Sequence, residues 1–396
     1  MTARASRAEV VRFRLAAHHL DGRGSESDLV DVAGRCGVQD SPPGSALLAL
    51  HARVEGISTE RLDGALGEDK SLLTTWAMRG APFVVPTADA AVFTAGVLPP
   101  TEEATRRLLQ GVGPSLDRLG LSLTEAVDLT SDEIRDVLGG RRLAVGELGA
   151  ELSARVAPRL PRDRRGTWTE EGPYAAGQPL GEGVVHFCLR VLTLQGVVCF
   201  APREGNQAPF VLVDEWLGHP LPDADPQAAR AELLRRYLRC YGPSTRADFA
   251  AWLGVRAGDV GPWWEPIEDE LAPVDVGRRA WLLADDLDAL GSTPAPTGVR
   301  LLPPRDPYTQ LRDRETIVGM EHHREMWKSV GAPGTVLVDG EVAGTWRPRK
   351  SGTTLTLAVT TFDALPQRAE KELRREAEQL APLRGAASVD VRLATS

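Results

Sequence analysis

The sequence predicts an α+β protein in which three tandem winged-helix units precede a small β-rich, barrel-like C-terminal domain. Capped helices followed by short β-branched segments occur in this order three times before about residue 297. After that point, β-type segments joined by glycine-containing turns dominate. The predicted domains are therefore 1–100, 101–222, 223–296 and 297–396. The helical units are too dissimilar in sequence to be called a repeat.

Length and composition indicate a globular protein with several domains. With 396 residues the chain is too long for a single core. Its hydrophobic share of 42% and charged share of 26% are ordinary, and no apolar run approaches the length of a membrane span. Residues 1–15 are basic but lack the continuous apolar stretch of a signal peptide. We therefore expect a cytoplasmic protein whose four cysteines, none in a Cys-x-x-Cys pair, are reduced thiols.

The charge balance limits the ways in which this chain can bind nucleic acid. A net charge of −9 argues against a strongly basic protein that coats nucleic acid without regard to sequence. It does not exclude a DNA-binding protein whose arginines gather on one face. Only four of the 46 lysines and arginines are lysines, and such arginine usage is compatible with phosphate contacts.

The first unit contains four predicted helices and a β-hairpin. Apolar periodicity and capping residues place the helices at Ala8–Leu20, at Asp28–Arg35, after Pro43 and at Ser58–Leu66. Two strands within LLTTWAMRGAPFVVP then flank Arg79-Gly80, and Thr87 caps a further helix. Several helices followed by a two-stranded ribbon are typical of a winged helix.

The second and third units show the same order with longer helices. In the second unit, helices are predicted in TEEATRRLL, LTEAVDL, LTSDEIRDVLG, RRLAVGELGAELSARV and EGVVHFCLRVLTLQG. Two strands around a turn at Gly205-Asn206 follow them. In the third unit, the helix in AARAELLRRYLRCYG and a helix capped by Ser244 or Thr245 precede a short strand in RRAWLLA.

The C-terminal domain is predicted to be mainly β-structure. Its strands lie in GVRLLPPRDPYTQLRDRE, GTVLVDGEVAGTWRPRK and GTTLTLAVTTF, with turns at Asp339-Gly340 and Ser351-Gly352. One helix is predicted at Gln367–Leu380, and ASVDVRLA closes the chain as a strand. This pattern favours a small β-barrel-like domain.

The stretch that most suggests chemistry is CGVQDSPPGSALLALHAR, which begins at Cys36. Gln39, Asp40 and Ser41 precede two prolines and a glycine, and the apolar run that follows predicts a helix capped by Ser41 or Ser45. Three polar side chains then stand just ahead of a helix N-terminus, a geometry suited to holding a water molecule or an anionic group. The alternative interpretation is an ordinary polar corner between two helices.

Five stretches of the chain carry a resemblance to a known family. They are GVQDSPPGSALLALHAR, TWAMRGAPFVVPTADA, YLRCYGPSTRADFAAWLG, LLPPRDPYTQLRDRE and VLVDGEVAGTWRPR. In their order and spacing, the chain resembles the winged-helix DNA glycosylases typified by AlkZ and, more distantly, YcaQ. The resemblance implies three tandem winged helices and a β-barrel-like domain, arranged as a C around double-stranded DNA.

The activity that this resemblance implies is excision of purines alkylated on a ring nitrogen. It includes the unhooking of interstrand crosslinks made by bacterial genotoxins, as DNA repair and self-resistance. An alkylated purine is already a good leaving group, so the enzyme mainly positions a water at the anomeric carbon and stabilises the positive charge that develops there. No metal, cofactor or Schiff-base lysine is required. The implied partner is damaged duplex DNA, bound by a monomeric protein at the nucleoid.

The chain departs from the family pattern at its catalytic motif. In the AlkZ type the motif is Gln, a spacer residue and Gln, and in the YcaQ type the last residue is Asp. Gln39 matches the first position, whereas Ser41 falls on the second with Asp40 as the spacer. Either Ser41 positions the water, or a shift of one residue lets Asp40 supply the carboxylate. The candidate catalytic residues are therefore Gln39, Asp40 and Ser41.

The resemblance also suggests that Arg79, Arg312, His322 and His323 contact DNA. Arg79 follows Trp76 at the first predicted wing, where both can approach the duplex. In the alternative interpretation Trp76 is a core residue and Arg79 is a surface residue in an ion pair. The two interpretations of this wing remain open at the level of sequence.

Other polar residues are weaker candidates. His18-His19 and the second histidine pair are poor metal sites, because adjacent side chains in a helix or strand point apart. Asp306 and Tyr308 follow a Pro-Pro turn and either line a cleft or, as we favour, form a structural turn. The sequence contains no GxGxxG, P-loop or GxSxG motif, which leaves nucleotide-binding and serine-hydrolase functions without support.

Three functional hypotheses follow. The first is a DNA glycosylase acting on alkylated or crosslinked DNA through Gln39 and either Asp40 or Ser41. The second is a non-catalytic winged-helix DNA-binding protein or regulator that has lost the second catalytic group. The third is a winged-helix scaffold for protein contacts, which the acidic charge balance allows. An arginine-lined surface near Gln39 favours the first two, and release of a modified base separates the first from the second.

Overall fold

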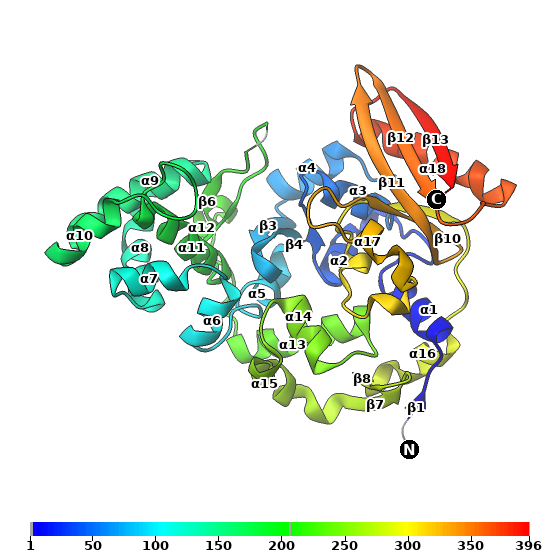
Figure 1. Cartoon of the computed structure of the whole chain (residues 1–396), viewed down its shortest axis with the longest axis horizontal. Helices are drawn as coiled ribbons and strands as arrows, with labels where there is room; N and C mark the ends of the chain where they lie inside the picture. The colour runs from blue at the N-terminus through cyan, green and yellow to red at the C-terminus, as the bar shows by residue number, and fades with distance from the viewer. Residues whose placement is uncertain (1–2, 206, 396) are drawn as a thin grey trace. The chain divides into compact units, whose positions relative to one another are not determined.

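The computed structural model describes residues 3–205 and 207–395, which form two compact units (Figure 1). The first unit is discontinuous in sequence and comprises Met1–Leu62, Leu234–Trp252 and Ile267–Ser396, and the second comprises Asp63–Leu233 and Leu253–Pro266. The predicted α+β class is confirmed, while the division into four domains stays a prediction. The boundaries between the two units fall inside three helices, α4 (Thr59–Gly67), α13 (Pro226–Tyr241) and α14 (Arg246–Leu253).

In the first unit, the N-terminal helix α1 (Arg7–Ala17) begins within one residue of its predicted start. A capping box fixes this start: the Glu9 amide donates to the Ser6 hydroxyl at 3.3 Å, and the Ser6 amide donates to the Glu9 carboxylate at 2.7 Å. Val10 and Phe13 on its buried face pack against β7, β8 and α16. The elements around it are β1 (Ala3–Arg4), α2 (Leu29–Gly34), β2 (Val38–Gln39), α3 (Ser45–His51), β7 (Leu271–Asp275), β8 (Arg279–Leu283) and α16 (Leu287–Ser292).

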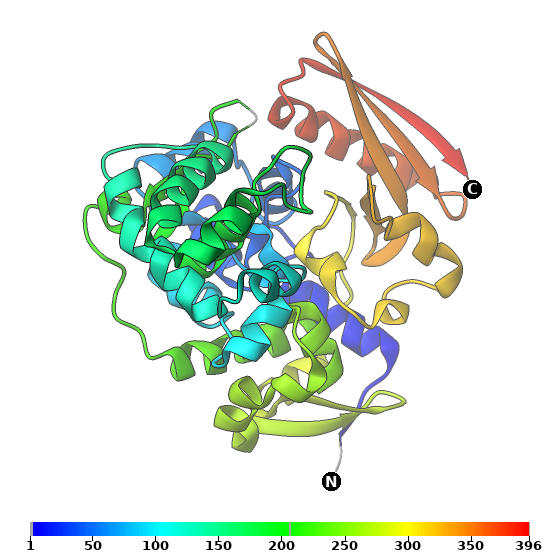
Figure 2. The same cartoon turned by 60° about the vertical axis from the view of Figure 1, so that its left-hand side comes forward.

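A five-stranded sheet forms the C-terminal part of the first unit. Its strand order is β13-β12-β11-β10-β9, and neighbouring strands are antiparallel except for the parallel pair β12–β13. The helix α18 lies along one face of the sheet (Figures 1 and 2) and buries Leu355 and Leu357 under its own Leu373 and Leu380. The elements are β9 (Val299–Leu302), α17 (His323–Met326), β10 (Gly334–Val338), β11 (Glu341–Ser351), β12 (Thr354–Thr361), α18 (Gln367–Leu383) and β13 (Ser388–Thr395).

The β-rich character and the late helix of this region are confirmed, but its barrel-like form is not. Among the described residues, β9 and β13 are the two edges of an open sheet. The sheet stays open because α18 already covers the apolar face that a closed barrel would turn inward.

The second unit consists mainly of helices packed on a small antiparallel sheet. Within this unit the strand order is β4-β3-β5-β6, and the Thr74–Phe200 pair joins two hairpins that the sequence assigned to different winged-helix units. Both hairpins are confirmed, although Asn206 of the second predicted turn lies outside the described residues. The strands are β3 (Leu72–Trp76), β4 (Pro82–Pro86), β5 (Val198–Phe200) and β6 (Phe210–Leu212). The helices are α5 (Ala90–Phe93), α6 (Glu102–Leu108), α7 (Gly113–Leu119), α8 (Leu123–Leu138), α9 (Val145–Val156), α10 (Arg162–Thr169), α11 (Leu180–Leu194), α12 (Val213–Leu217) and α15 (Gly261–Trp264).

The core of the second unit lies between α8, α9 and α11. The prediction of two helices in LTEAVDL and LTSDEIRDVLG is wrong, since α8 runs through both. The reason is that the Thr130 hydroxyl donates to the Ala126 carbonyl at 2.7 Å and so stays inside the helix instead of capping a new one. Trp76 packs edge-on against Phe200 and Phe210, with ring centroids 5.1 Å away in each case, which supports its interpretation as a core residue. None of the helices among residues 3–205 and 207–395 combines the length and apolar character needed to cross a bilayer.

Candidate active site

The turn that leads from β2 into α3 carries the three candidate catalytic residues. Oδ1 of Asp40 accepts hydrogen bonds from the amides of Gly44 at 2.8 Å and Ala46 at 3.2 Å. Asp40 therefore caps α3, and the prediction that Ser41 or Ser45 caps it is wrong. The double-proline turn folds the chain back so that the Asp40 carboxylate reaches the first free amides, while Ser45 is buried inside the helix.

Gln39 ends β2 with its side chain in the protein interior, and only 3% of the residue is exposed. Within the described part of the chain, its Oε1 accepts no hydrogen bond. A buried carbonyl oxygen without a donor carries an unfavourable free energy, so a small donor such as water is favoured at this atom. Next to it, Ser41 is half-buried. The pair thus offers one buried amide and one hydroxyl close to the surface.

A buried ion pair anchors the far end of this segment. The guanidinium of Arg53 donates to both carboxylate oxygens of Asp306, at 2.8 and 2.7 Å, and to the Ala49 carbonyl of α3 at 2.7 Å. Asp306 also accepts from the Tyr308 amide at 2.9 Å. The two charged side chains are 3% and 0% exposed. Asp306 and Tyr308 thus form the structural turn that the sequence favoured, and Asp306 fixes, through Arg53, the helix that follows the candidate catalytic residues.

Beside this segment the structure brings together three residues that are far apart in the sequence. Ligand atoms of His18, Cys36 and Cys240 lie within 4.8 Å of one another, and all three residues are buried. The two neighbouring thiols perturb one another, so that the pKa of Cys36 is lowered and the pKa of Cys240 is raised. The rings of Tyr241 and Tyr308 enclose His18 edge-on, at centroid distances of 5.1 and 5.6 Å. Three donors fall one short of a structural zinc site, so we interpret the group as a buried thiol–imidazole contact.

Two of the candidate DNA-contact residues line one cavity of the first unit. Arg312 and His323 both face a cavity of about 670 Å³. His322 instead stacks on Phe362, with ring centroids 3.6 Å apart, and lines a separate cavity of about 380 Å³. The adjacent histidines therefore face different cavities.

Arg79 belongs to the second unit, whereas the other candidate site residues belong to the first. It lies in the turn between β3 and β4 with a φ of +57°, and its side chain is partly buried. A positive φ is uncommon for a residue other than glycine, so this tight turn fixes the direction of the side chain. The structure thus places Gln39, Asp40 and Ser41 in one turn of the first unit and Arg79 in a turn of the second unit.

Sequence reasoning missed four further arginines. The same cavity as that of Arg312 and His323 is also lined by Arg7, Arg14, Arg278 and Arg314. Arg14 and Arg278 are distant in sequence from that segment and carry no motif that would link them to it. The Arg-Asp-Arg triplet that contains Arg312 was the one signal available, since it places two like charges on either side of an acid.

Comparisons with known proteins agree with this architecture. Over residues 32–383, the chain matches the family described as DNA glycosylase AlkZ-like. It is 29% identical over 408 aligned residues to the interstrand DNA cross-link repair glycosylase of Streptomyces sahachiroi, covering 98% of this chain and 100% of that protein. It is also similar to the solved structure of the Streptomyces sahachiroi DNA glycosylase AlkZ, with a TM-score of 0.77 and 27% identity, covering 99% of this chain and 100% of the solved one.

Proposed function

This chain belongs to the AlkZ-like DNA glycosylase family, and on this premise we propose that it is a monofunctional DNA glycosylase. Its substrates would be purines alkylated on a ring nitrogen and the interstrand crosslinks that such alkylation creates. The observation that carries this proposal is the buried Gln39, whose side-chain oxygen lacks a donor within the described residues, at the position of the family's first catalytic residue.

Gln39 would orient the attacking water. Its Oε1 accepts a hydrogen bond from that water, which holds the water oxygen toward the anomeric carbon of the sugar. The water oxygen bonds to this carbon as the glycosidic C–N bond breaks, and the alkylated purine leaves with the bonding electrons as a neutral base. One water proton must then be accepted by a base. Burial of Gln39 supports this role, since a buried amide keeps one orientation.

Asp40 is the better candidate for the second catalytic group. Its Oδ1 accepts hydrogen bonds from two backbone amides at the start of α3, and these bonds fix the carboxylate in place. A fixed negative charge interacts strongly with the cation that develops on the sugar and accepts the proton released by water. Ser41 offers only a dipole, so it would help to place the water without balancing that charge.

The family relationship supports further features of the proposal. The substrate would be double-stranded DNA, bound by a monomer in the cytoplasm at the nucleoid. Three winged-helix units would provide the DNA-binding surface, with Arg79, Arg312, His322 and His323 as contacts. The crosslink-repair name of the Streptomyces sahachiroi relative supports a role in resistance to DNA-crosslinking genotoxins. No metal or cofactor enters this mechanism.

One observation favours a second candidate function, that of a non-catalytic damage-binding protein. The second motif position holds Ser41 instead of glutamine or aspartate, and the neighbouring Asp40 already serves as a helix cap. If the cap is the whole role of Asp40, the protein binds DNA without cleaving the glycosidic bond.

Incubation with duplex DNA alkylated on purine ring nitrogens separates the two functions. After alkaline cleavage of abasic sites, the glycosylase predicts strand breaks at the alkylated purines and a released base that mass spectrometry identifies. Retention of every alkylated base, together with tight DNA binding, would assign the protein to the second function. A crosslinked duplex in the same assay tests whether unhooking is part of the activity.

A further inference from the structure

The cavity of about 670 Å³ in the first unit is unusually rich in arginine. Its lining comes from α1, the segment that follows α13, the first turn of α14, the turn between β7 and β8, and residues 312–316 together with residue 323. Five arginines face it against three carboxylates. This excess of positive charge occurs in a chain whose net charge is −9, so the cavity is a local exception to the charge of the whole protein.

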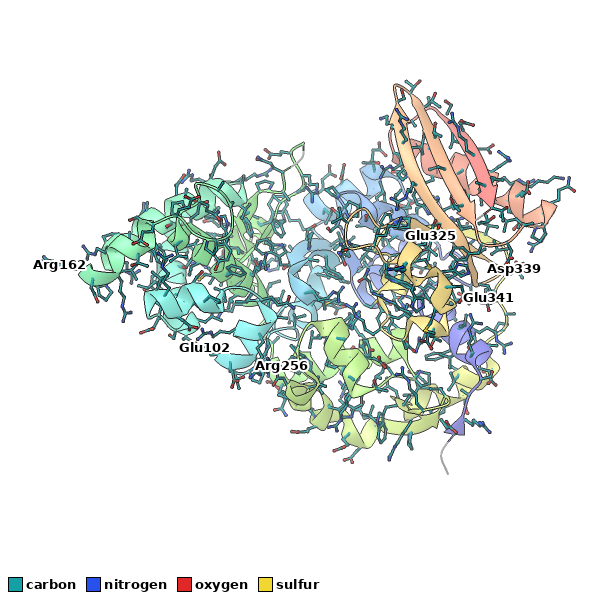
Figure 3. The ribbon with its side chains drawn as sticks, viewed as in Figure 1. Glu102, Arg162, Arg256, Glu325, Asp339 and Glu341 are labelled. Atoms are coloured by element: carbon teal, nitrogen blue, oxygen red, sulfur yellow. The ribbon has the colours of Figure 1, made fainter. Side chains whose placement is uncertain are left out.

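Most charged groups of the lining neutralise one another. Arg14 donates to both carboxylate oxygens of Asp313, at 3.1 and 2.8 Å, and Arg278 donates to Asp248 at 2.8 Å. Arg7 is paired at 2.8 Å with Glu341, which Figure 3 labels next to Asp339. These pairs hold the walls of the cavity in place and account for two of its three acids.

Arg312 and Arg314 have no such partner. Neither guanidinium makes an ion pair with a carboxylate of residues 3–205 or 207–395, and the buried Nε of Arg312 donates to no acceptor there. Cζ of Arg314 lies 4.5 Å from the centroid of the Trp327 ring, a cation–π contact that occupies only one face of the guanidinium. Burial lowers the pKa of both groups, and the charge of Arg312 lowers the pKa of Arg314 further. Two partly buried guanidinium groups that repel each other require a counter-charge that the described chain does not supply.

From this geometry we propose that the cavity binds a phosphate group of the DNA backbone through Arg312 and Arg314. Planar guanidinium groups donate two parallel hydrogen bonds to phosphate oxygens, which matches the donors left over in this cavity. A phosphate contact of this kind fixes the position of the duplex and carries no sequence information. The inference rests on the proposed function, because it takes DNA to be the ligand of the first unit.

A free phosphate or nucleotide offers the same chemistry, and the test distinguishes the two sources. The variant is Arg312→Gln/Arg314→Gln, which removes both unpaired charges. Arg324→Gln is the matched control, since Arg324 is an exposed arginine that lies in α17 and does not line the cavity. DNA affinity is measured by fluorescence anisotropy on an alkylated duplex over a series of salt concentrations, and thermal midpoints are measured with inorganic phosphate and with chloride at equal ionic strength.

The proposal predicts that the slope of log affinity against log salt falls by about one to two in the double variant and stays unchanged in the control. It also predicts that the thermal midpoint of the double variant is equal to or above that of wild type, because removing the two guanidinium groups relieves the repulsion between their charges. An unchanged slope would overturn the DNA assignment. If inorganic phosphate also stabilised wild type but not the double variant, a free phosphate would be the ligand. A lowered midpoint together with an unchanged slope would assign the arginines to fold stability alone.

Base release from the same duplex keeps this inference separate from the proposed function. A wild type that releases no base but shows a slope dependent on Arg312 and Arg314 would refute the glycosylase and leave the phosphate site standing. If wild type releases base, and the salt dependence of DNA affinity is the same for wild type and the double variant, the phosphate site alone is refuted.

Discussion

Replacing Asp306 by asparagine tests how the fold holds helix α3, which follows the candidate catalytic residues. Asp306 is the counter-charge of Arg53, and their side chains are 0% and 3% exposed. Asp306→Asn leaves the guanidinium buried beside a neutral amide, with its remaining hydrogen bond to the Ala49 carbonyl intact. Breaking a buried ion pair by removing one partner costs about 3–5 kcal/mol. Since a domain is stable by only about 5–15 kcal/mol, the variant loses a large part of its stability.

Urea denaturation followed by circular dichroism measures this loss. The matched control is Asp390→Asn, which breaks the exposed pair of Arg392 and Asp390, whose side chains are 72% and 49% exposed. Exposed pairs contribute little, so the control should unfold at nearly the urea concentration of wild type. The double variant Arg53→Met/Asp306→Leu removes both charges and should recover part of the loss. If Asp306→Asn unfolded at the midpoint of wild type, the structural role of this pair would be refuted.

Three further predictions concern titration, thiol reactivity and the catalytic carboxylate. Burial lowers the pKa of His51 to about 4 in the folded protein, whereas the pKa of histidine in the unfolded chain is about 6.5. The free energy of unfolding is therefore highest above pH 6.5, and it falls by up to about 3 kcal/mol as the pH drops toward 4, because the unfolded chain takes up a proton there. Urea midpoints should show a shallower pH dependence for His51→Phe than for wild type, and equal slopes would contradict this. Burial raises the pKa values of Cys188 and Cys199 to about 12, so both thiols should stay unreactive toward Ellman's reagent at pH 8 until urea unfolds the protein, and rapid labelling of the folded protein would argue against their burial. Asp40→Asn keeps an acceptor for the α3 amides and removes the charge, so base release should fall while DNA affinity holds or rises, and Ser41→Ala should have little effect. The opposite ranking would favour Ser41 as the second catalytic group.

Local chemistry made most secondary-structure elements predictable from the sequence. Helix α1 follows from the apolar periodicity of Ala8–Leu20, and the hairpin β3–β4 follows from its β-branched segments around Gly80. The two errors have different causes. Thr130 looked like a cap but forms a local hydrogen bond within its own helix α8, whereas the C-terminal strands stay in an open sheet because a tertiary contact with α18 covers their apolar face.

The sequence shows where the candidate site residues lie, but it does not show the contacts that hold them in place. The position of Gln39, Asp40 and Ser41 before a helix was evident from the prolines that follow them. The capping role of Asp40 was not, since it depends on how tightly the double-proline turn folds back. Contacts between distant segments, such as Arg53 with Asp306, leave no local pattern in one sequence. Arg312 and Arg314 of the cavity are visible in the sequence as part of an Arg-Asp-Arg triplet. Their lack of an ion-pair partner among the described residues is a property of the folded chain.

Base release by Gln39→Ala under single-turnover conditions tests the central claim most directly. The rate of release from duplex DNA alkylated on purine ring nitrogens is compared with that of wild type and of the control Gln195→Ala, which shortens an exposed glutamine at the end of α11. We predict a rate at least about tenfold below wild type for Gln39→Ala, equivalent to losing about 1.4 kcal/mol of transition-state stabilisation, with unchanged DNA affinity and a control equal to wild type. A Gln39→Ala variant that releases base at the rate of wild type would remove Gln39 from the mechanism and contradict the account.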